Sequence, residues 1–326
     1  VCSLAIMGSS CDKFHGNIKD YLRGAEVVVA NRGDASISFI DAATNELIET
    51  VDLPDGVEPM YVVYVSSKDK IYVGDRANSQ VHIFNPESRK IEGSIDVGDG
   101  VFHMWADGRG KRLWVNNDVD NTISVINLAS EKVIRTITLD GKPHDVFVTK
   151  DGTMAYISIL VPEGPDRVYA YNARNMKMVA ATEVGEDPHL FHLQHNNRLY
   201  VPCQNTNQVL TLDGESLEVL VDTPMDGAHG IFADRKEENL YITGINVSKL
   251  YSVDAANSQL NGTPVETSIV IPHNVVLNRS ASKLFVTHSG ATANKVSIFD
   301  VEDGILREEE IITTATNPFG IAYVKR

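Results

Sequence analysis

The sequence is short of basic residues and has no long hydrophobic run. It contains 29 Lys and Arg residues against 44 Asp and Glu residues, which gives a net charge of −15. Non-specific nucleic-acid binding needs a basic surface, so this balance argues against a nucleic-acid partner. No apolar stretch approaches the ~18 residues that a membrane-spanning helix needs. We therefore expect no membrane span, and a small-molecule substrate that is neutral, cationic or metal-bound.

Several motifs of common enzyme classes are also missing. The chain has no GxSxG, no P-loop and no GxGxxG that opens a helix, which disfavours acyl-serine, nucleotide and dinucleotide chemistry. From residue 25 onward no long segment shows the 3.6-residue period of a helix. With 43% hydrophobic and 22% charged residues the chain is nevertheless globular. These absences leave an all-β protein.

Cysteine is scarce, with only Cys2, Cys11 and Cys203. Cys2 and Cys11 are close enough for a small disulfide loop, although spacing alone does not prove the pairing. The opening VCSLAIMGSSC is apolar like part of a signal peptide but has no basic start. We read it as mature sequence of an exported protein, periplasmic or extracellular.

Short β-rich runs separated by turns repeat along the chain. One run closes each time with Asp or Asn, and these closing residues are 41 to 46 positions apart. The seven runs are SISFID, QVHIFN, TISVIN, RVYAYN, QVLTLD, KLYSVD and KVSIFD. An Asx side chain bonds the backbone ahead of it, so each run is predicted to be a strand that ends in a tight turn.

Two further runs precede this one in each repeat and another strand follows it, so the unit has four strands. The last copy of the first run, GIAYV at residues 320–324, stands at the C-terminal end. Ring closure explains this displacement, because a blade shared between the two chain ends leaves no open sheet edge. We predict an all-β, seven-bladed β-propeller of four antiparallel strands per blade over residues 25–326. Residues 1–24 form an N-terminal extension outside the repeat.

The motif LYVPCQNTNQVLTLD, together with LWVNNDVDNTISVIN, resembles the YVTN-repeat propeller family. The resemblance covers residues 25–326 and implies the seven-bladed fold. It says little about function, because such propellers bind, scaffold or catalyse.

Histidine recurs at one position of the repeat, just before the innermost strand. The seven residues at this position are Met60, His103, His144, His189, His229, His273 and Phe319. The chain has ten His residues in all, so five in one column is a strong signal. Equivalent positions of a propeller meet around its axis, and we expect these side chains to converge at one mouth of the central channel.

A second column lies at the end of the next strand, which runs antiparallel and reaches the same face. It consists of Asn31, Asp75, Asn117, Ile159, Cys203, Gly244 and His288. His288 is therefore a sixth candidate ligand. Crowded neutral imidazoles favour a cation, and all-imidazole sites suit copper, zinc or iron rather than calcium or magnesium. The alternative is that each His only caps its loop by bonding a backbone carbonyl.

Other polar residues are predicted near the same face. Asp75 and Glu58 are candidate general bases beside a metal-bound water. The alternative is that they only accept hydrogen bonds from loop amides. Arg32, Arg76 and Lys142 come from loops on this face, where they would attract an anion or remain ordinary surface charge. Cys203 is either a soft ligand or a buried, inert thiol.

Three functions follow from these patterns. The histidine cluster resembles that of copper propeller enzymes, nitrous oxide reductase and thiocyanate dehydrogenase, which implies an oxidoreductase with an external electron acceptor. A second hypothesis is a divalent-metal lyase or hydrolase, similar to streptogramin-lyase or oligogalacturonate-lyase propellers. A third is a non-catalytic binding propeller or a subunit of a larger complex. We favour a transition-metal enzyme, with copper ahead of zinc and iron.

Overall fold

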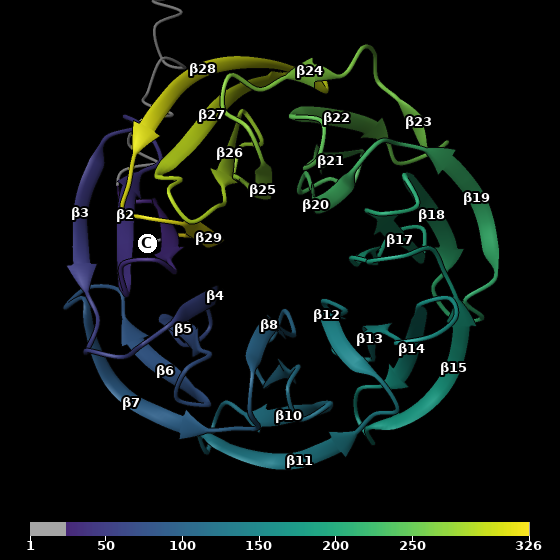
Figure 1. Cartoon of the computed structure of the whole chain (residues 1–326), viewed down its shortest axis with the longest axis horizontal. Helices are drawn as coiled ribbons and strands as arrows, with labels where there is room; N and C mark the ends of the chain where they lie inside the picture. The colour runs from purple at the N-terminus through teal and green to yellow at the C-terminus, as the bar shows by residue number, and fades with distance from the viewer. Residues whose placement is uncertain (1–23, 326) are drawn as a thin grey trace, which may run out of the picture.

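The computed structural model describes residues 24–325 as seven small sheets arranged in a ring around a central opening (Figure 1). Each sheet is a blade, and all strand pairs within the blades are antiparallel. The predicted seven-bladed propeller is confirmed. The predicted link between Cys2 and Cys11 lies outside the described residues. No helix among residues 24–325 is long and apolar enough to cross a membrane.

Blade 1 is shared between the two ends of the described chain. Its strand order is β29-β1-β2-β3, so the last strand forms the inner edge beside the first. The register pairs Glu26 with Val324 and Val28 with Ala322. This confirms the predicted closure, in which the strand that contains GIAYV pairs with residues 26–31.

The strands fall into four concentric sets. The innermost strands are β4 (Pro59–Val65), β8 (Val101–Ala106), β12 (Lys142–Val148), β16 (Phe191–Leu193), β20 (Ala228–Ala233), β25 (Pro272–Leu277) and β29 (Pro318–Val324). The second strands are β5 (Lys70–Asp75), β9 (Arg112–Asn117), β13 (Met154–Leu160), β17 (Arg198–Cys203), β21 (Asn239–Gly244), β26 (Lys283–His288) and β1 (Glu26–Asn31). In each list the strands are given in order from blade 2 to blade 7, and the strand of blade 1 comes last.

The third strands are β6 (Gln80–Asn85), β10 (Thr122–Asn127), β14 (Arg167–Asn172), β18 (Gln208–Asp213), β22 (Lys249–Asp254), β27 (Lys295–Glu302) and β2 (Ser36–Asp41). The outer strands are β7 (Lys90–Asp96), β11 (Lys132–Thr138), β15 (Lys177–Glu183), β19 (Val219–Pro224), β28 (Ile305–Thr313) and β3 (Leu47–Asp52). In blade 6 two short strands, β23 (Gln259–Leu260) and β24 (Val265–Glu266), both pair with β22 and together replace one outer strand.

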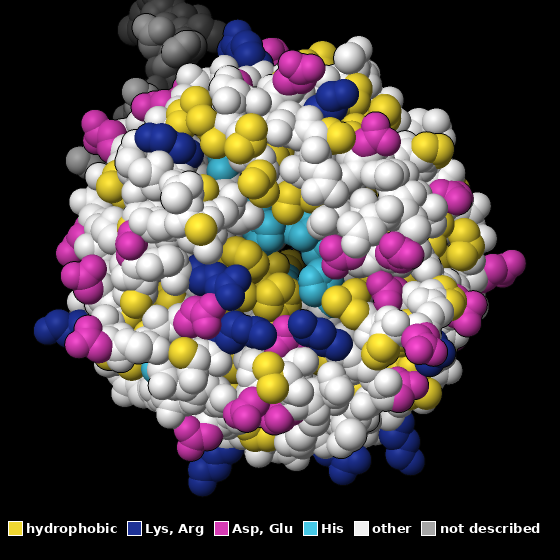
Figure 2. Space-filling view, in the orientation of Figure 1, with side chains coloured by type: hydrophobic (Ala, Val, Ile, Leu, Met, Phe, Trp, Pro, Cys, Tyr) yellow, Lys and Arg dark blue, Asp and Glu magenta, His cyan; other side chains and the backbone are white. Residues whose placement is uncertain are grey.

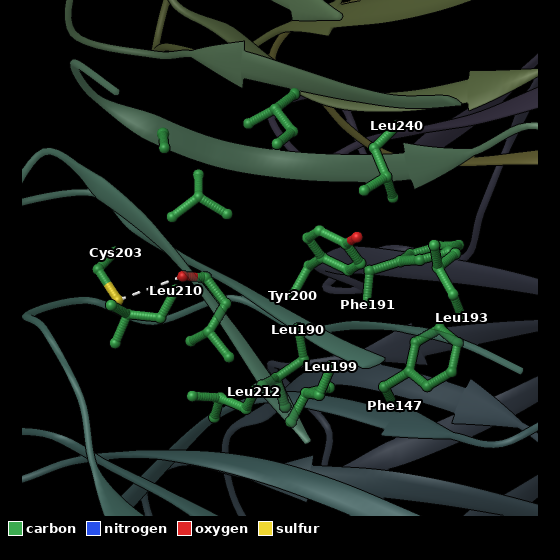
Figure 3. Close-up of a cluster of buried hydrophobic side chains, with 14 of the residues drawn as sticks. Phe147, Leu190, Phe191, Leu193, Leu199, Tyr200, Cys203, Leu210, Leu212 and Leu240 are labelled. Atoms are coloured by element: carbon green, nitrogen blue, oxygen red, sulfur yellow. Dashed lines mark hydrogen bonds between the residues drawn. The ribbon is translucent and has the colours of Figure 1, made fainter. Parts of the chain in front are cut away.

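Burial explains why the second and third strands lack an alternating pattern. Every residue of β1 is buried, whereas β7 on the outside alternates between exposed and covered positions. A blade packs against a neighbour on both faces, so its middle strands are buried on both faces and rich in apolar residues. Figure 3 shows one such cluster, which runs from Cys203 and Leu210 at one end to Phe147 and Phe191 at the other.

The predicted Asx turns form in six blades. In blade 3, for example, Asn127 Oδ1 accepts hydrogen bonds from the backbone N–H groups of Ala129 and Ser130. The equivalent acceptors are Asp41, Asn85, Asn172, Asp213 and Asp254. Blade 7 differs, because β27 continues past Asp300 to Glu302 and the turn falls at Asp303 and Gly304. The longer hairpin moves the turn away from the Asx residue.

Candidate metal centre

Six of the seven innermost strands carry a β-bulge near their start. In blade 4, Pro143 pairs with Ile159 and Val146 with Ile157, so two residues of β12 lie opposite Ser158 alone. The bulged pairs are Met60–Tyr61, Phe102–His103, His144–Asp145, His229–Gly230, His273–Asn274 and Phe319–Gly320. Blade 5 has no bulge, because His189 and Leu190, between the paired residues Pro188 and Phe191, lie opposite the two residues Val201 and Pro202. Bulges re-aim side chains, and here they do so at the channel mouth.

Six aromatic side chains at these positions form a closed ring, which we call the rim. Its members are Phe102, His144, His189, His229, His273 and Phe319. Centroids of successive rings are 3.8 to 6.1 Å apart, and the tightest pair is His189 and His229. Figure 2 shows histidine and hydrophobic side chains together around the central opening. Blade 2 contributes Tyr61, which contacts Phe102 and Phe319 at 5.7 and 5.5 Å.

The sequence alignment placed His103 one residue out of register. In the structure Phe102, not His103, lies at the rim position, since Val101 pairs with Asn117 as Pro143 pairs with Ile159. His103 is the second residue of its bulge and lies against Tyr61, with ring centroids 4.2 Å apart. Its Nδ1 atom is 2.6 Å from Asp145 Oδ1. The rim therefore holds four histidines, and His103 lies one residue farther along the channel.

Three of the four rim histidines are buried and held neutral. His189, His229 and His273 are 5 to 6% exposed. Burial, followed by the neighbouring histidines, lowers the pKa of His189 and His229 well below the usual value. The same causes lower the pKa of His273 to about 3. Desolvation and like charge both disfavour the imidazolium, so each ring presents a lone pair at neutral pH.

Two of these lone pairs have no partner. His229 Nδ1 is 2.7 Å from Gln204 Oε1, and because that oxygen only accepts, Nδ1 carries the proton. The unprotonated Nε2 of His229 is buried and has no hydrogen-bond partner among the described residues. The same holds for Nε2 of His189 in the adjoining blade. A buried acceptor without a partner is costly, so this pair of nitrogens calls for an explanation.

Two carboxylates that the sequence analysis did not single out complete the site. Asp187 Oδ1 lies 3.3 Å from His144 Nδ1, and the ligand atoms of His144, Asp187 and His189 all lie within 4.8 Å of one another. Asp145 is buried, with Oδ2 3.8 Å from His189 Nδ1. Asp145 directly follows His144 and Asp187 lies two residues before His189, and this closeness in sequence was the only available signal.

The second predicted column does not reach the channel. His288 is fully buried within blade 7, with Nδ1 3.0 Å from Val270 O and Nε2 2.8 Å from Ser297 Oγ. The structure therefore does not bring His288 together with the rim histidines. Side chains alternate along a strand, and the last residue of each second strand points into its own blade. Asn31 and Asn117 likewise bond serines of the third strand in their blades.

Asp75 belongs to the same column and points into blade 2. Its carboxylate accepts hydrogen bonds from the backbone N–H groups of Glu58, Ala77 and Asn78, and lies 3.0 Å from His82 Nε2. These bonds, led by that of His82, lower the pKa of Asp75 against the opposing effect of burial. The structure places Asp75 in a loop-holding network.

Glu58 lies nearer the mouth, in a cluster of charges beside the rim. It pairs with Arg32 at 2.6 Å, and the Arg32 guanidinium lies 5.7 Å from the Phe319 ring. Arg76 lies 6.0 Å from the Phe102 ring and pairs with Asp118 at 2.8 Å. Lys142 also contacts Asp118, at 3.2 Å. Three cations thus flank the apolar part of the rim.

Cys203 is an inert thiol. It is fully buried at the end of β17, and its Sγ atom donates to Val201 O at 3.4 Å, as Figure 3 shows. Burial raises the pKa of Cys203 to about 12. A thiol held in the protonated form is a poor ligand, so Cys203 is part of the core.

The fold and the rim define a seven-bladed propeller with a histidine-lined channel mouth. The chain belongs to the YNCE-like β-propeller family, whose model matches residues 20–276. No protein with a curated description matches the chain. The family resemblance expected from the repeats is confirmed.

Several solved structures have the same fold. The periplasmic gluconolactonase PpgL of Pseudomonas aeruginosa is similar with a TM-score of 0.76 at 14% identity, over 92% of this chain and 99% of that one. Kuenenia stuttgartiensis hydrazine synthase is similar with a TM-score of 0.71 at 12% identity, over 82% of this chain and 90% of that one. The dihydro-heme d1 dehydrogenase NirN is similar with a TM-score of 0.64 at 11% identity, over 92% of this chain and 75% of that one. At these identities the likeness shows the fold alone.

Proposed function

We propose that the rim binds a transition-metal ion and that the chain is a metal-dependent oxidoreductase acting on a small anion. The observation that carries this proposal is the pair of buried, unpartnered Nε2 atoms of His189 and His229. A cation that accepts both lone pairs removes two desolvation penalties at once. Hydrogen bonds to loop carbonyls would satisfy the rings one at a time, but neither Nε2 has such a bond.

Copper is the preferred ion because of the donor set. His144, His189, His229 and His273 supply imidazole nitrogen, and among the divalent first-row metals copper binds such ligands most tightly. Gln204 orients His229 through Nδ1, an arrangement that fixes the tautomer of metal-ligating histidines. Asp145 is placed to do the same for His189. When bound, copper supplies one-electron chemistry.

The charge cluster beside the rim supports an anionic substrate. Arg32 and Arg76 lie against the rings of Phe319 and Phe102, and Lys142 shares Asp118 with Arg76. Within residues 24–325 the ion pairs of these three cations involve two carboxylates, Glu58 and Asp118, so the cluster has one positive charge in excess. A small anion would bind there, next to the histidines. The electrons would pass to an external acceptor.

Asp187 favours a second candidate, a zinc- or iron-dependent lyase or hydrolase. Two histidines and one carboxylate are a ligand set of zinc hydrolases and of non-heme iron enzymes. His144, His189 and Asp187 are close enough to form this set without His229. The two candidates therefore differ in which residue must join His144 and His189 for metal binding, Asp187 or His229.

Metal analysis tests both candidates. Purified protein is stripped with chelator, equilibrated separately with Cu(II), Zn(II) and Fe(II), and analysed for bound metal and, with copper, by electron paramagnetic resonance. We expect about one copper ion per chain and nitrogen hyperfine structure. His229→Ala should weaken copper binding by about 10- to 100-fold, while His195→Ala, whose ring is 53% exposed on another loop, should not change it.

The variant Asp187→Asn separates the alternatives. If it abolishes zinc or iron binding while His229→Ala leaves it intact, the lyase or hydrolase candidate replaces the copper enzyme. Failure of all three metals to bind above the level of the double variant His189→Ala, His229→Ala contradicts the proposal as a whole.

A further inference from the structure

The central channel contains a second compartment on the far side of Tyr61. A cavity of about 490 Å³ extends along the channel from Tyr61 to the opposite mouth of the ring. Burial raises the pKa of Tyr61, so the phenol stays neutral. His103 and Asn274 line the cavity, whereas the four rim histidines do not. The cavity is therefore distinct from the candidate metal centre.

Aromatic residues form a continuous wall on one side of this cavity. Trp105, Phe147, Phe191 and Phe232 occupy the same position in blades 3 to 6. Successive ring centroids are 4.6, 5.0 and 5.5 Å apart. The equivalent residues of the other three blades are Val63, Val276 and Ala322, so the opposite side of the channel has no rings there. A flat ligand can pack on such a one-sided wall.

Three basic residues lie at the outer mouth of the cavity. Lys150, Arg235 and Arg279 come from the turns that end the innermost strands of blades 4, 6 and 7, and all three line the cavity. None of the three forms an ion pair with a described residue.

The carboxylates of the same mouth are already engaged. Asp107 accepts hydrogen bonds from backbone N–H groups of its own turn, including that of Arg112 at 2.7 Å. Asp234 accepts from the N–H of Asn239 at 3.0 Å, and Glu237 pairs with His195 at 3.0 Å. The cations are thus the charges left to meet a ligand.

We propose that this cavity is a binding site for aromatic anions, in which rings pack on the Trp105–Phe232 wall and a carboxylate or sulfonate meets the cations of the mouth. An apolar pocket with a few convergent polar groups is the usual form of a small-molecule site. The wall recognises the ring, and the mouth recognises the charge. This site goes beyond the proposed metal chemistry, since it shares none of the rim residues.

Calorimetric titration with three matched probes tests the site. Naphthalene-2-sulfonate has both ring and charge, naphthalene-2-sulfonamide lacks the charge, and methanesulfonate lacks the ring. We expect one molecule of naphthalene-2-sulfonate to bind per chain. The sulfonamide should bind at least ~5-fold more weakly than the sulfonate, and methanesulfonate should show no detectable binding.

Variants locate the bound probe. Trp105→Ala should weaken sulfonate binding by ~10-fold or more because it removes the first ring of the wall. Arg235→Gln and Arg279→Gln should each weaken sulfonate binding by ~3-fold or more. Each should also reduce the ratio of the affinity for the sulfonate to that for the sulfonamide. Val179→Ala and Lys90→Gln, on outer strands, are the matched apolar and basic controls and should change nothing.

Acrylamide quenching provides a readout that does not depend on a variant. Trp114 is fully buried, so quenching of the chain's two tryptophans reports chiefly on Trp105. Bound sulfonate should protect this emission. Equal affinity for sulfonate and sulfonamide, unchanged quenching, or loss of binding in Arg32→Gln and Arg76→Gln rather than in Arg235→Gln and Arg279→Gln would overturn the assignment.

Discussion

Two kinds of buried histidine occur at one face of this propeller. His229 at the rim and His288 at the end of β26 are both buried, and burial lowers the pKa of each. Both ring nitrogens of His288 have partners in its own blade, whereas Nε2 of His229 has none. Burial alone therefore does not mark a ligand. The unpartnered Nε2 atom of His229 is the feature on which the proposed metal site rests.

The largest expected effect comes from removing the strand that both kinds of histidine need. Deletion of residues 320–326 takes away most of β29, exposes the inner edge of β1 and opens the ring. The loss should exceed the 5 to 15 kcal/mol of free energy of unfolding that a typical domain has. Circular dichroism and gel filtration should show an unfolded or aggregated chain. A folded monomer with native Tm would contradict the role of ring closure.

The next largest effect on stability should come from adding a methyl group to the backbone beside the rim. A Cβ atom at Gly230 would lie 2.1 Å from His273 O, so Gly230→Ala forces two innermost strands apart. Such overpacking costs about 3 kcal/mol, and it should displace His229 as well. Urea unfolding measures the loss. Gly93→Ala on the outer strand β7, where the nearest atom is 3.6 Å away, is the control and should stay within about 0.5 kcal/mol of wild type.

Asp145→Asn should affect the rim without unfolding the blade. The carboxylate lies 2.6 Å from His103 Nδ1 and accepts the backbone N–H of Leu190 at 2.9 Å. An amide keeps the shape but removes the charge that orients the rings on either side. We expect copper affinity to fall by about 10-fold or more, with little change in Tm. An unchanged affinity would show that the rim histidines orient themselves.

Acid should distinguish the structural histidine from its replacement. Burial lowers the pKa of His288, so below about pH 6.5 the unfolded chain binds a proton that the folded chain does not. The stability that neutral His288 provides is complete above this pH and falls by at most about 1.4 kcal/mol per pH unit below it. His288→Asn, which copies Asn31 and Asn117 in blades 1 and 3, lacks this loss.

Urea unfolding at pH 7.5 and pH 5.5 measures that difference. Wild type should lose more stability than His288→Asn between the two pH values, and His195→Asn, at an exposed ring, should behave like wild type. Parallel pH dependence of wild type and His288→Asn would mean that His288 is protonated within the fold.

The sequence was enough to predict the architecture, because each level of the repeat carries its own signal. Strand order, blade number and ring closure all follow from where short runs recur, and GIAYV at the end of the chain has no other partner. The convergence of His144, His189, His229 and His273 at one mouth also follows, since one repeat position maps to one place around the axis.

What the sequence could not give depends on register and on side-chain direction. A bulge adds one residue without changing composition, so His103 aligned with the rim although Phe102 occupies it. The end of β26 does reach the same face, but alternation turns His288 into the blade. Asp187 lies two residues before His189 in a loop, where a carboxylate is too common to stand out.

Ring closure has a consequence for the order in which the molecule is made. Strands β1, β2 and β3 leave the ribosome before any other blade, yet their inner edge waits for residues 318–324. Blade 1 is thus the first to be translated and the last to be completed. Until then β1, with four apolar residues at its centre, presents an unpaired edge. Pairing this edge joins residues from nearly opposite ends of the sequence, which makes closure the slow and aggregation-prone step of folding.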